Sequence, residues 1–241
     1  MEYFDAHNHL QFYPADAALD AAMAAAAAAG VTGMLCCGTS PEDWGRVLEI
    51  SCRYPGVTPC FGLHPWYAGE AGWQGRLEEF LRRAPGACVG EVGLDAVKAR
   101  PGQLEDLEAQ LGLARAFGRP AVLHCVRDWG ALLEQMKKAK LPVFLLHGYG
   151  GPAEMVKDFA ALGGYFSFGA ALADPGRERL RAALAAAPAD RLLFETEAPD
   201  AGGPAGIKAV VAAAAAELGR PDEELAELSA ANAGRFVKGS I

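Results

Sequence analysis

The residues of this chain that could carry chemistry are its five histidines, each of which stands at or just beyond the end of an apolar, strand-like run. Two glutamates hold equivalent positions, after Ala87–Val89 and Leu192–Phe194. In a parallel α/β barrel the carboxyl ends of the strands converge on one face, which holds the active site. Imidazole and carboxylate groups are common ligands of divalent metals. The side chains that this placement would bring together are His7, His9, His64, Glu91, His124, His147 and Glu197.

The pair His7 and His9 illustrates why the residues must be interpreted together. Side chains two positions apart on a strand share a face, so the two imidazoles could chelate one cation, and Asp5 on the same face could orient a ligand through a hydrogen bond. A single H-x-H pair is more often a surface or core feature. Independent core histidines, however, have no reason to choose the same end of several strands, so the joint pattern predicts a metal site.

The number of candidate ligands indicates how many ions such a site would hold. Four histidines and two or three carboxylates exceed the needs of one tetrahedral ion, so two ions bridged by a carboxylate are expected. Mixed nitrogen and oxygen ligands suit Zn, Mn, Fe or Mg without choosing among them. Two cations about 3.5–4 Å apart activate water for in-line displacement. The chemistry expected is hydrolysis of a phosphoester or an amide-like bond.

The elements that must position these residues alternate along the whole chain. Apolar runs predict strands near 2–7, 31–37, 57–63, 87–92, 120–124, 142–147, 164–168 and 191–196. Helices are expected near 16–29, 41–53, 74–83, 103–117, 128–139, 152–162, 176–187, 205–218 and 222–236. We therefore predict an α/β fold, a single (β/α)8 TIM barrel over residues 1–241 with its metal site at the C-terminal strand ends. A doubly wound open sheet is the alternative, but it concentrates its ligands at one switch point.

Composition narrows the class of protein. The 241 residues are close to the roughly 250 of a typical barrel, and a net charge of −8 argues against a general nucleic-acid coat. The N-terminus carries no basic and apolar signal segment, and the Ala-rich stretches at 21–29 and 212–216 are interrupted by charges, so no membrane association is expected. The six cysteines show no C-x-x-C pairing and are expected to be reduced, mostly buried side chains of a cytoplasmic protein.

Several blocks of the sequence together resemble the TatD family of metal-dependent deoxyribonucleases, within the amidohydrolase-like barrels. The blocks are Asp5–His9, Gly62–Trp66, Gly90–Asp95, Gln110–Ala114, Leu123–Cys125, His147–Gly151, Leu193–Pro199 and Asn232–Phe236. The match runs nearly from end to end, and the blocks are specific only in combination.

The resemblance implies roles for the individual residues. It implies that His7 and His9 bind one divalent ion, that Glu91 bridges two, and that His124 and His147 bind the second. Glu197 would complete the first ion's shell and orient or deprotonate the attacking water, so that Glu91 and Glu197 are the catalytic carboxylates. His64 at the rim and Arg127 would contact the substrate. The implied cofactors are two ions of Mg, Mn or Zn, and the implied substrate is DNA or a short oligonucleotide.

Three departures from the family pattern bear on that substrate. Glu197 stands where aspartate is usual, Arg127 lies one position beyond the family's His-x-Arg arginine, and the segment 200–204 lacks a longer basic loop. A deoxyribonuclease is the leading hypothesis. A small-molecule amidohydrolase or phosphotriesterase-like enzyme on the same scaffold is favoured by the acidic charge but opposed by the absence of a strand-end lysine. A degenerate barrel that binds metal without turnover is the third hypothesis, motivated by residue 197.

Overall fold

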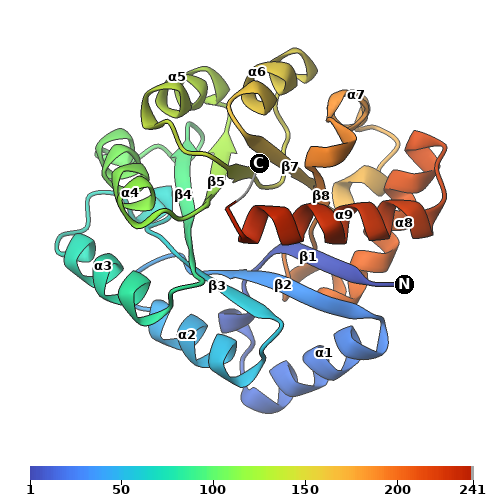
Figure 1. Cartoon of the computed structure of the whole chain (residues 1–241), viewed down its shortest axis with the longest axis horizontal. Coiled ribbons are helices and arrows are strands. Elements are labelled where there is room, and N and C mark those ends of the chain that lie inside the picture. Colours follow the sequence, from blue (N-terminus) through green and yellow to red (C-terminus); the bar gives the residue numbers. More distant parts are fainter. Residues whose placement is uncertain (240–241) are drawn as a thin grey trace.

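Eight parallel strands in the order β1 to β8 form the centre of the molecule in the computed structural model, which describes residues 1–239 (Figure 1). The strands are β1 Tyr3–Asn8, β2 Val31–Cys37, β3 Val57–Phe61, β4 Cys88–Asp95, β5 Ala121–Val126, β6 Phe144–Leu146, β7 Gly164–Phe168 and β8 Leu192–Phe194. The predicted TIM barrel is confirmed. Residues 240 and 241 of the predicted single domain lie outside the described residues.

Hydrogen bonds at the rim complete the barrel between β1 and the segment that follows β8. The N–H of Glu197 donates to the carbonyl of His7 at 3.1 Å, and the N–H of His9 donates to the carbonyl of Ala198 at 2.7 Å. The buried carboxylate of Asp5 accepts hydrogen bonds from the N–H of Thr196 at 2.9 Å and from its hydroxyl at 2.6 Å. The first and last candidate ligands are thereby fixed against each other.

Helices surround the strands and connect each strand to the next (Figure 1). They are α1 Asp16–Ala28, α2 Trp44–Arg53, α3 Trp73–Arg83, α4 Gln103–Phe117, α5 Trp129–Ala139, α6 Val156–Ala161, α7 Glu178–Ala186, α8 Ile207–Leu218 and α9 Asp222–Val237. Because each connection carries helices on the outside of the barrel, the strands are buried on both faces and read as apolar runs.

Three helices begin later than expected, and local hydrogen bonds explain why. Residues 41–43 form a turn before α2, since the Asp43 carboxylate accepts the N–H of Thr39 at 2.9 Å and its hydroxyl at 2.8 Å. The segment before α6 is a short 3-10 helix, Ala153–Met155. The residue just before this helix, Pro152, accepts a hydrogen bond at its carbonyl from the Tyr149 hydroxyl. Before α7, the side chain of Asp174 accepts the N–H of Gly176 at 2.8 Å.

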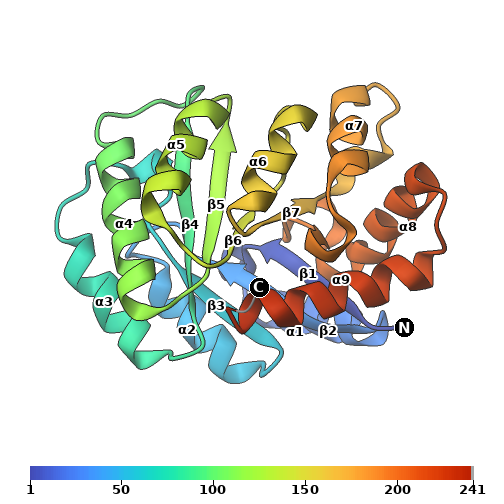
Figure 2. The same ribbon diagram turned by 45° about the horizontal axis from the view of Figure 1, so that its top comes forward.

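The C-terminal helix α9 closes the amino-terminal end of the barrel, opposite to the carboxyl ends of the strands. Figure 1 shows it crossing in front of the strands, and Figure 2 shows it at the lower end while the arrowhead of β5 points upward. Its buried Ala233 and Phe236 belong to the same cluster as side chains of the barrel interior, among them Leu35, Cys60, Val122 and Tyr165. The amino-terminal mouth is therefore filled by apolar packing, and the carboxyl-terminal mouth is left for polar side chains.

Two further expectations concern the cysteines and membranes. Cys52 is exposed and the other five cysteines are buried, all as free thiols, as expected. Within residues 1–239, no helix combines the length and the apolar character that a bilayer span requires.

Candidate metal centre

Glu91 on β4 is the hub of the polar cluster at the carboxyl-terminal mouth. Its Oε2 lies 3.3 Å from Nε2 of His7 and 3.4 Å from Nε2 of His9. Its Oε1 faces three other imidazoles, at 3.1 Å from His64 Nε2, 2.8 Å from His124 Nδ1 and 2.8 Å from His147 Nε2. All five histidines thus meet one carboxylate, whose two oxygens face different sets of rings.

The register of the strands explains this convergence. Leu123 on β5 pairs with Leu146 on β6, so His124 and His147 follow at the same level of the barrel. The N–H of His147 donates to the Leu123 carbonyl at 3.1 Å, which holds the end of β6 against β5. On β4, Gly93 pairs with His124, so Glu91, two residues earlier on the same strand, lies deeper in the barrel than His124. Residues far apart in the chain become neighbours because parallel strands end together.

Glu197 approaches the same cluster from beyond β8. Its Oε2 lies 3.7 Å from His7 Nε2 and 3.8 Å from His9 Nε2, and its Oε1 lies 3.3 Å from His147 Nδ1. The residue has a positive φ of 59°, a conformation that is uncommon outside glycine and costs of the order of 1 kcal/mol. The turn after β8 holds this conformation so that the carboxylate points at three imidazoles.

Acceptors beside the outer ring nitrogens orient two histidines and fix the tautomer of His9. Nδ1 of His9 lies 2.7 Å from the carbonyl of Cys37, which only accepts, so Nδ1 carries the proton and the Nε2 lone pair faces His7 and Glu91. Nδ1 of His124 donates to Oε1 of Glu91 at 2.8 Å, and Nε2 of the same ring lies 3.4 Å from the carboxylate of Asp95, which would accept the ring N–H if an ion took the place of the proton on Nδ1. His9 thus presents a free lone pair to the centre, and Asp95 lets His124 do the same when Nδ1 gives up its proton, as metal ligands require.

His64 differs from these two rings. Its Nδ1 accepts the backbone N–H of Trp66 at 3.2 Å, so the proton is on Nε2, which donates to Oε1 of Glu91. The geometry groups His64 with Glu91 and His124 as atoms close enough to share an ion. We favour the donor role, because a protonated Nε2 has no lone pair for a metal.

The charges of the cluster compensate one another. Burial raises the pKa of Glu91, but the neighbouring His64, His147 and His7 and the hydrogen bond from His124 outweigh burial and hold this pKa well below its ordinary value. Burial lowers the pKa of His147, but Glu91, Glu195 and Glu197 raise it well above its ordinary value. The carboxylates are therefore ionised, and protons are held on the buried rings, where a cation would bring the same positive charge.

The donor set of the cluster fits divalent ions. Its ligand atoms form three groups in which all members lie within 4.8 Å of one another: His7 with His9 and Glu91, His7 with His147 and Glu197, and His64 with Glu91 and His124. Nδ1 of His147 is buried without a hydrogen-bond partner among the described residues. Nitrogen atoms of different rings also face each other, at 3.2 Å between His7 and His9 and 3.4 Å between His124 and His147. Such close approach of ring nitrogens suits a shared cation.

The cluster forms the floor of a pocket of about 440 Å³. Phe12 and Trp66 stand at its rim with 50% and 39% of their surfaces exposed, so apolar surface borders the polar floor. The volume lies within the range of small-ligand sites, with apolar walls and a few convergent polar groups.

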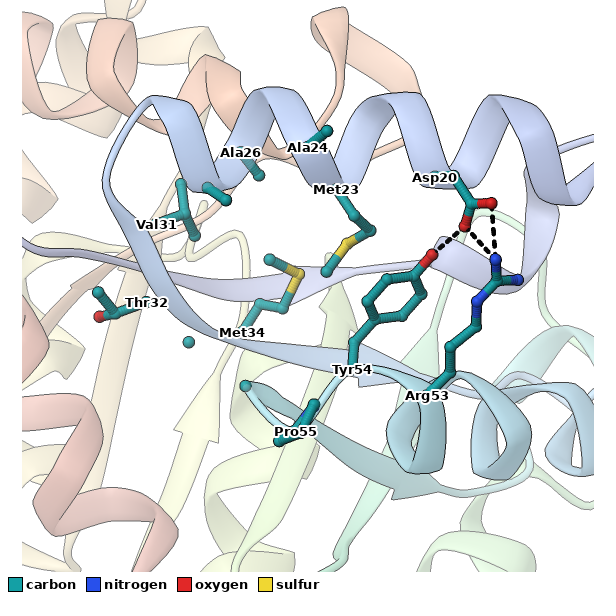
Figure 3. Close-up of a pocket in the computed structure, with 13 residues that line it drawn as sticks. Asp20, Met23, Ala24, Ala26, Val31, Thr32, Met34, Arg53, Tyr54 and Pro55 are labelled. Carbon is teal, nitrogen blue, oxygen red and sulfur yellow. Dashed lines mark hydrogen bonds and ion pairs between the residues drawn. The ribbon is translucent and has the colours of Figure 1, made fainter.

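A second hollow, of about 600 Å³, lies at the opposite end of the barrel between α1, the start of β2 and the turn before β3 (Figure 3). Its polar groups satisfy one another, because Asp20 binds both the guanidinium of Arg53, at 2.6 Å, and the hydroxyl of Tyr54. Met23 and Met34 line the rest, and no histidine contributes to its lining. We therefore place the chemistry at the histidine cluster.

Comparison with known proteins identifies the family of this chain. Residues 4–238 match the family model of the TatD-related DNases. The chain belongs to the TatD family. It is 31% identical over 207 residues to the uncharacterized metal-dependent hydrolase YjjV of Escherichia coli K12, covering 82% of this chain and 80% of YjjV. It is 34% identical over 190 residues to the 3′-5′ ssDNA/RNA exonuclease TatD of Edwardsiella piscicida, covering 73% and 72%.

Solved structures of the TatD family have the same fold. The crystal structure of Escherichia coli YjjV superposes with a TM-score of 0.90 over 97% of both chains, at 28% identity. A TatD family hydrolase from Entamoeba histolytica gives a TM-score of 0.84 over 98% of both chains, at 15% identity, which concerns the fold alone. Family membership makes this chain a metal-dependent hydrolase that acts on ester bonds, as the sequence predicted.

Six of the residues singled out in the sequence lie together in this TatD family barrel. His7, His9, Glu91, His124, His147 and Glu197 converge within the distances given above. His64 joins them on the floor of the pocket and not at its rim, with only 4% of its surface exposed. Arg127 does not line this pocket. It is exposed, with a positive φ of 58°, beside a neighbouring groove.

No role was predicted from the sequence for several residues that orient the histidines of the cluster. Asp95 binds Nε2 of His124, and the buried Glu195 lies 3.7 Å from Nδ1 of His147 while accepting the hydroxyl of Ser167. A signal existed for Asp95, since it is four positions after Glu91 on one strand and therefore on the same face. Gln11 also bonds the carbonyl that holds His9, at 2.7 Å, and nothing in its sequence position announces that contact.

Proposed function

We propose that this chain is a divalent-metal-dependent phosphodiesterase that cleaves single-stranded DNA or short oligonucleotides. The observation that carries the proposal is Glu91, whose two oxygens face different sets of imidazoles in the manner of a carboxylate between two cations. The substrate class is supported by the relatives named as 3′-5′ ssDNA/RNA exonucleases.

We assign one cation to His7, His9 and Glu197 and a second to His124 and His147, with Glu91 between them. Mg, Mn or Zn are the candidate ions, because nitrogen and oxygen ligands suit all three. Divalent ions at these positions would supply Lewis acidity toward a phosphate oxygen and toward the attacking water.

The chain's own residues then divide the remaining tasks. Glu197, held by the turn after β8, takes the proton of the attacking water, since its side chain is 40% exposed to the pocket while the Glu91 side chain is only 3% exposed. His64 donates from Nε2 to Glu91 and steadies that carboxylate, and the same N–H can reach a substrate phosphate oxygen. The apolar rim of Phe12 and Trp66 receives the parts of the substrate next to the scissile phosphate.

We further propose that residues 1–241 act as one catalytic domain in the cytoplasm. One barrel accounts for all of residues 1–239, and the free cysteines suit a reducing compartment.

The direct experiment is metal-dependent cleavage of a 5′-labelled single-stranded oligonucleotide by the full chain, stripped with EDTA and supplied with Mg²⁺, Mn²⁺ or Zn²⁺. We expect cleavage with at least one ion, and a loss of at least about a hundredfold in kcat/KM for Glu91→Gln and Glu197→Gln. Glu70→Gln is the matched control, because Glu70 is exposed in the β3–α3 connection and belongs to none of the ligand groups. Intact metal binding without cleavage at any ion would remove the nuclease assignment.

The pocket volume of about 440 Å³ favours a second candidate, a small-molecule hydrolase on the same scaffold. Parallel assays with nitrophenyl phosphodiesters, amides and lactones separate the two. Turnover of amides or lactones without cleavage of phosphodiesters would establish the second candidate.

A degenerate barrel without turnover is the remaining hypothesis, and it depends on Glu197. The longer side chain still reaches three imidazoles, which supports a working carboxylate at this position. Measurable rates in the native chain, retained in Glu197→Asp, would exclude the degenerate barrel. Metal binding without any turnover in both proteins would establish it.

A further inference from the structure

A groove of about 630 Å³ lies next to the metal pocket, on the same end of the barrel. Arg127 and Trp129 border it from the start of α5, the segment 150–154 from the β6–α6 connection, and Arg179 from the first turn of α7. The three helices α5, α6 and α7 follow one another along the barrel in Figure 2.

The groove carries two arginines without partners. Arg127 and Arg179 are exposed, and within residues 1–239 neither guanidinium forms an ion pair or a hydrogen bond. The arginines on either side of Arg179 are engaged: Arg181 on α7 lies 3.3 Å from Glu217, and Arg177, just before α7, lies 3.3 Å from Asp174. Glu154 is the one carboxylate among the residues that line the groove, so two positive charges face one negative charge.

The wall of the groove is closely packed. Trp129 packs edge-on against the buried Tyr149, with ring centroids 4.7 Å apart, and the Tyr149 hydroxyl donates to the Pro152 carbonyl at 2.8 Å. Gly151 permits this packing, because a Cβ there would lie 2.8 Å from atoms of both rings. The arginines therefore stand beside a rigid wall.

The groove is continuous in the chain with the metal centre. Arg127 follows His124 by three residues, and Gly150 follows His147 by three residues. Three steps of 3.8 Å limit each separation between α-carbons to about 11 Å. Between His147 and Gly150, Gly148 borders two carboxylates of the cluster, since a Cβ there would lie 3.1 Å from Glu195 and 3.9 Å from Glu197. A polymer whose reacting phosphate lies on the histidine cluster can reach the groove along the 147–151 loop.

We propose that this groove binds backbone phosphates of the single-stranded nucleic acid that flank the scissile bond, with Arg127 and Arg179 as their ligands. The proposal rests on the function proposed above and names where its substrate lies. Guanidinium groups suit phosphates because they form two parallel charge-assisted hydrogen bonds. The hollow of Figure 3 lacks this capacity, because its Arg53 is already bound to Asp20. The groove also explains how a chain of net charge −8 holds a polyanion, through a local pair of cations.

The test is the salt dependence of oligonucleotide binding by the full chain in EDTA, measured by the anisotropy of a 5′-fluorescein thymidine octamer. Each phosphate contact with a single strand contributes about −0.7 to the slope of log K against log salt concentration. The double variant Arg127→Ala/Arg179→Ala loses two contacts, so its slope should be shallower, that is less negative, by about 1.4. That slope corresponds to binding weakened on the order of fiftyfold at 50 mM salt and converging with the native chain near 1 M. The double variant Arg127→Lys/Arg179→Lys keeps both positive charges and should therefore keep the slope of the native chain.

Arg115→Ala is the matched control, because Arg115 is an exposed arginine in the last turn of α4, at the opposite end of the barrel. It should leave the slope unchanged. A native slope in the double alanine variant, an equal decrease in Arg115→Ala, or no binding by the native chain at 50 mM salt would each overturn the groove assignment. Turnover of bis(4-nitrophenyl) phosphate by the metal-loaded native chain reports on the metal centre alone. Lack of this turnover would count against the proposed function. The salt dependence of binding would still show whether Arg127 and Arg179 contact phosphates in the groove.

Discussion

The carboxylate of Glu91 owes its ionised state to the rings around it and their outer partners. Each oxygen faces at least two imidazole nitrogens within 3.4 Å, and the outer nitrogens of His9 and His124 are held by a carbonyl and a carboxylate. Both rings are thereby oriented toward Glu91 before any ion arrives, and the lone pair of His9 Nε2 points inward. We therefore expect residues outside the direct ligand set to control metal affinity.

Asp95 offers the sharpest test of that control. Burial raises the pKa of Asp95, but hydrogen bonds from Trp66 Nε1 and from the N–H groups of Lys98 and Val97 outweigh burial and hold this pKa at about 2. Both oxygens accept from fixed donors, so the amide of Asp95→Asn would leave a donor facing a donor. We expect metal affinity, measured by titration calorimetry, to fall about 10- to 100-fold.

The control for this substitution is Asp106→Asn. Asp106 also accepts a backbone N–H, from Gly69 at 2.8 Å, and an indole N–H, from Trp73 at 3.2 Å, but it touches no histidine. It should lose a similar amount of unfolding free energy and keep native metal affinity. Equal losses of affinity in the two variants would assign Asp95 a purely structural role.

Asp5 predicts a pH dependence of folding. Burial raises its pKa, and although Thr196 and Asn8 donate to the carboxylate, the pKa is about 7. Because the folded pKa exceeds the unfolded value, the stabilisation is complete below about pH 4 and is lost as the pH rises through about 7. The loss is about 4 kcal/mol for this group.

Asp5→Asn should remove that dependence, because asparagine does not titrate. The side-chain Oδ1 of Asn8 is buried without a partner among the described residues and can accept from the new amide. Urea unfolding in EDTA at pH 4 and pH 7.5 would measure it for both proteins. The native chain should lose several kcal/mol relative to the variant over this range. A difference that does not change with pH would contradict the assignment to Asp5.

At the scale of elements, apolar runs predicted the eight strands, and the residues that follow them predicted that the chemistry lies at the carboxyl ends. The sequence could not reveal that β4 extends to Asp95, because that extension depends on pairing of Asp95 with Val126 on β5. The late start of α2 depends likewise on a carboxylate that bonds back to Thr39. Local patterns predict elements, whereas their exact ends depend on partners that only the folded chain supplies.

The same distinction explains the candidate site. His7, His124 and His147 were found because each follows an apolar run that fixes its level in the barrel. The tautomer of His64 and the groove beside Arg127 were not found, because they depend on a turn hydrogen bond and on a contact with α7. Residue type predicted membership in the cluster, and geometry was needed for the roles.

Helix α9 carries the prediction at this scale. Phe236 is fully buried among side chains of the barrel interior, and Asn232 donates to the carbonyls of Ala189 and Leu192 at 2.8 Å, which fixes the helix to β8. Phe236→Ala should lower the unfolding free energy by about 3–5 kcal/mol in urea titrations, because it leaves a cavity at the closed mouth. Glu227→Ala, exposed on the same helix, should stay within about 0.5 kcal/mol. A loss below about 1 kcal/mol for Phe236→Ala would show that α9 does not seal the barrel.

For the molecule as a whole, the histidine cluster couples the stability of the fold to metal binding and to pH. In the metal-free protein His147 and His7 have raised pKa values, so protons on these rings balance Glu91 and Glu197. His147, whose folded pKa lies well above 6.5, stabilises the fold fully below pH 6.5 and loses this contribution as the pH rises through its folded pKa. A divalent ion bound at these rings would replace those protons, because only deprotonated imidazole binds metal.

The stabilisation by metal should therefore grow with pH. If one proton is displaced, apparent affinity rises up to tenfold per pH unit below the ring's pKa, or about 1.4 kcal/mol of added stability per unit at saturating ion. Thermal melts with EDTA or with Mn²⁺ at pH 6.5 and pH 8 should show the larger gain at pH 8. Calorimetry in buffers of different ionisation enthalpy should detect at least one proton released per chain. Glu70→Gln should behave like the native chain, whereas equal gains at the two pH values without proton release would mean that the ions bind elsewhere than at the protonated rings.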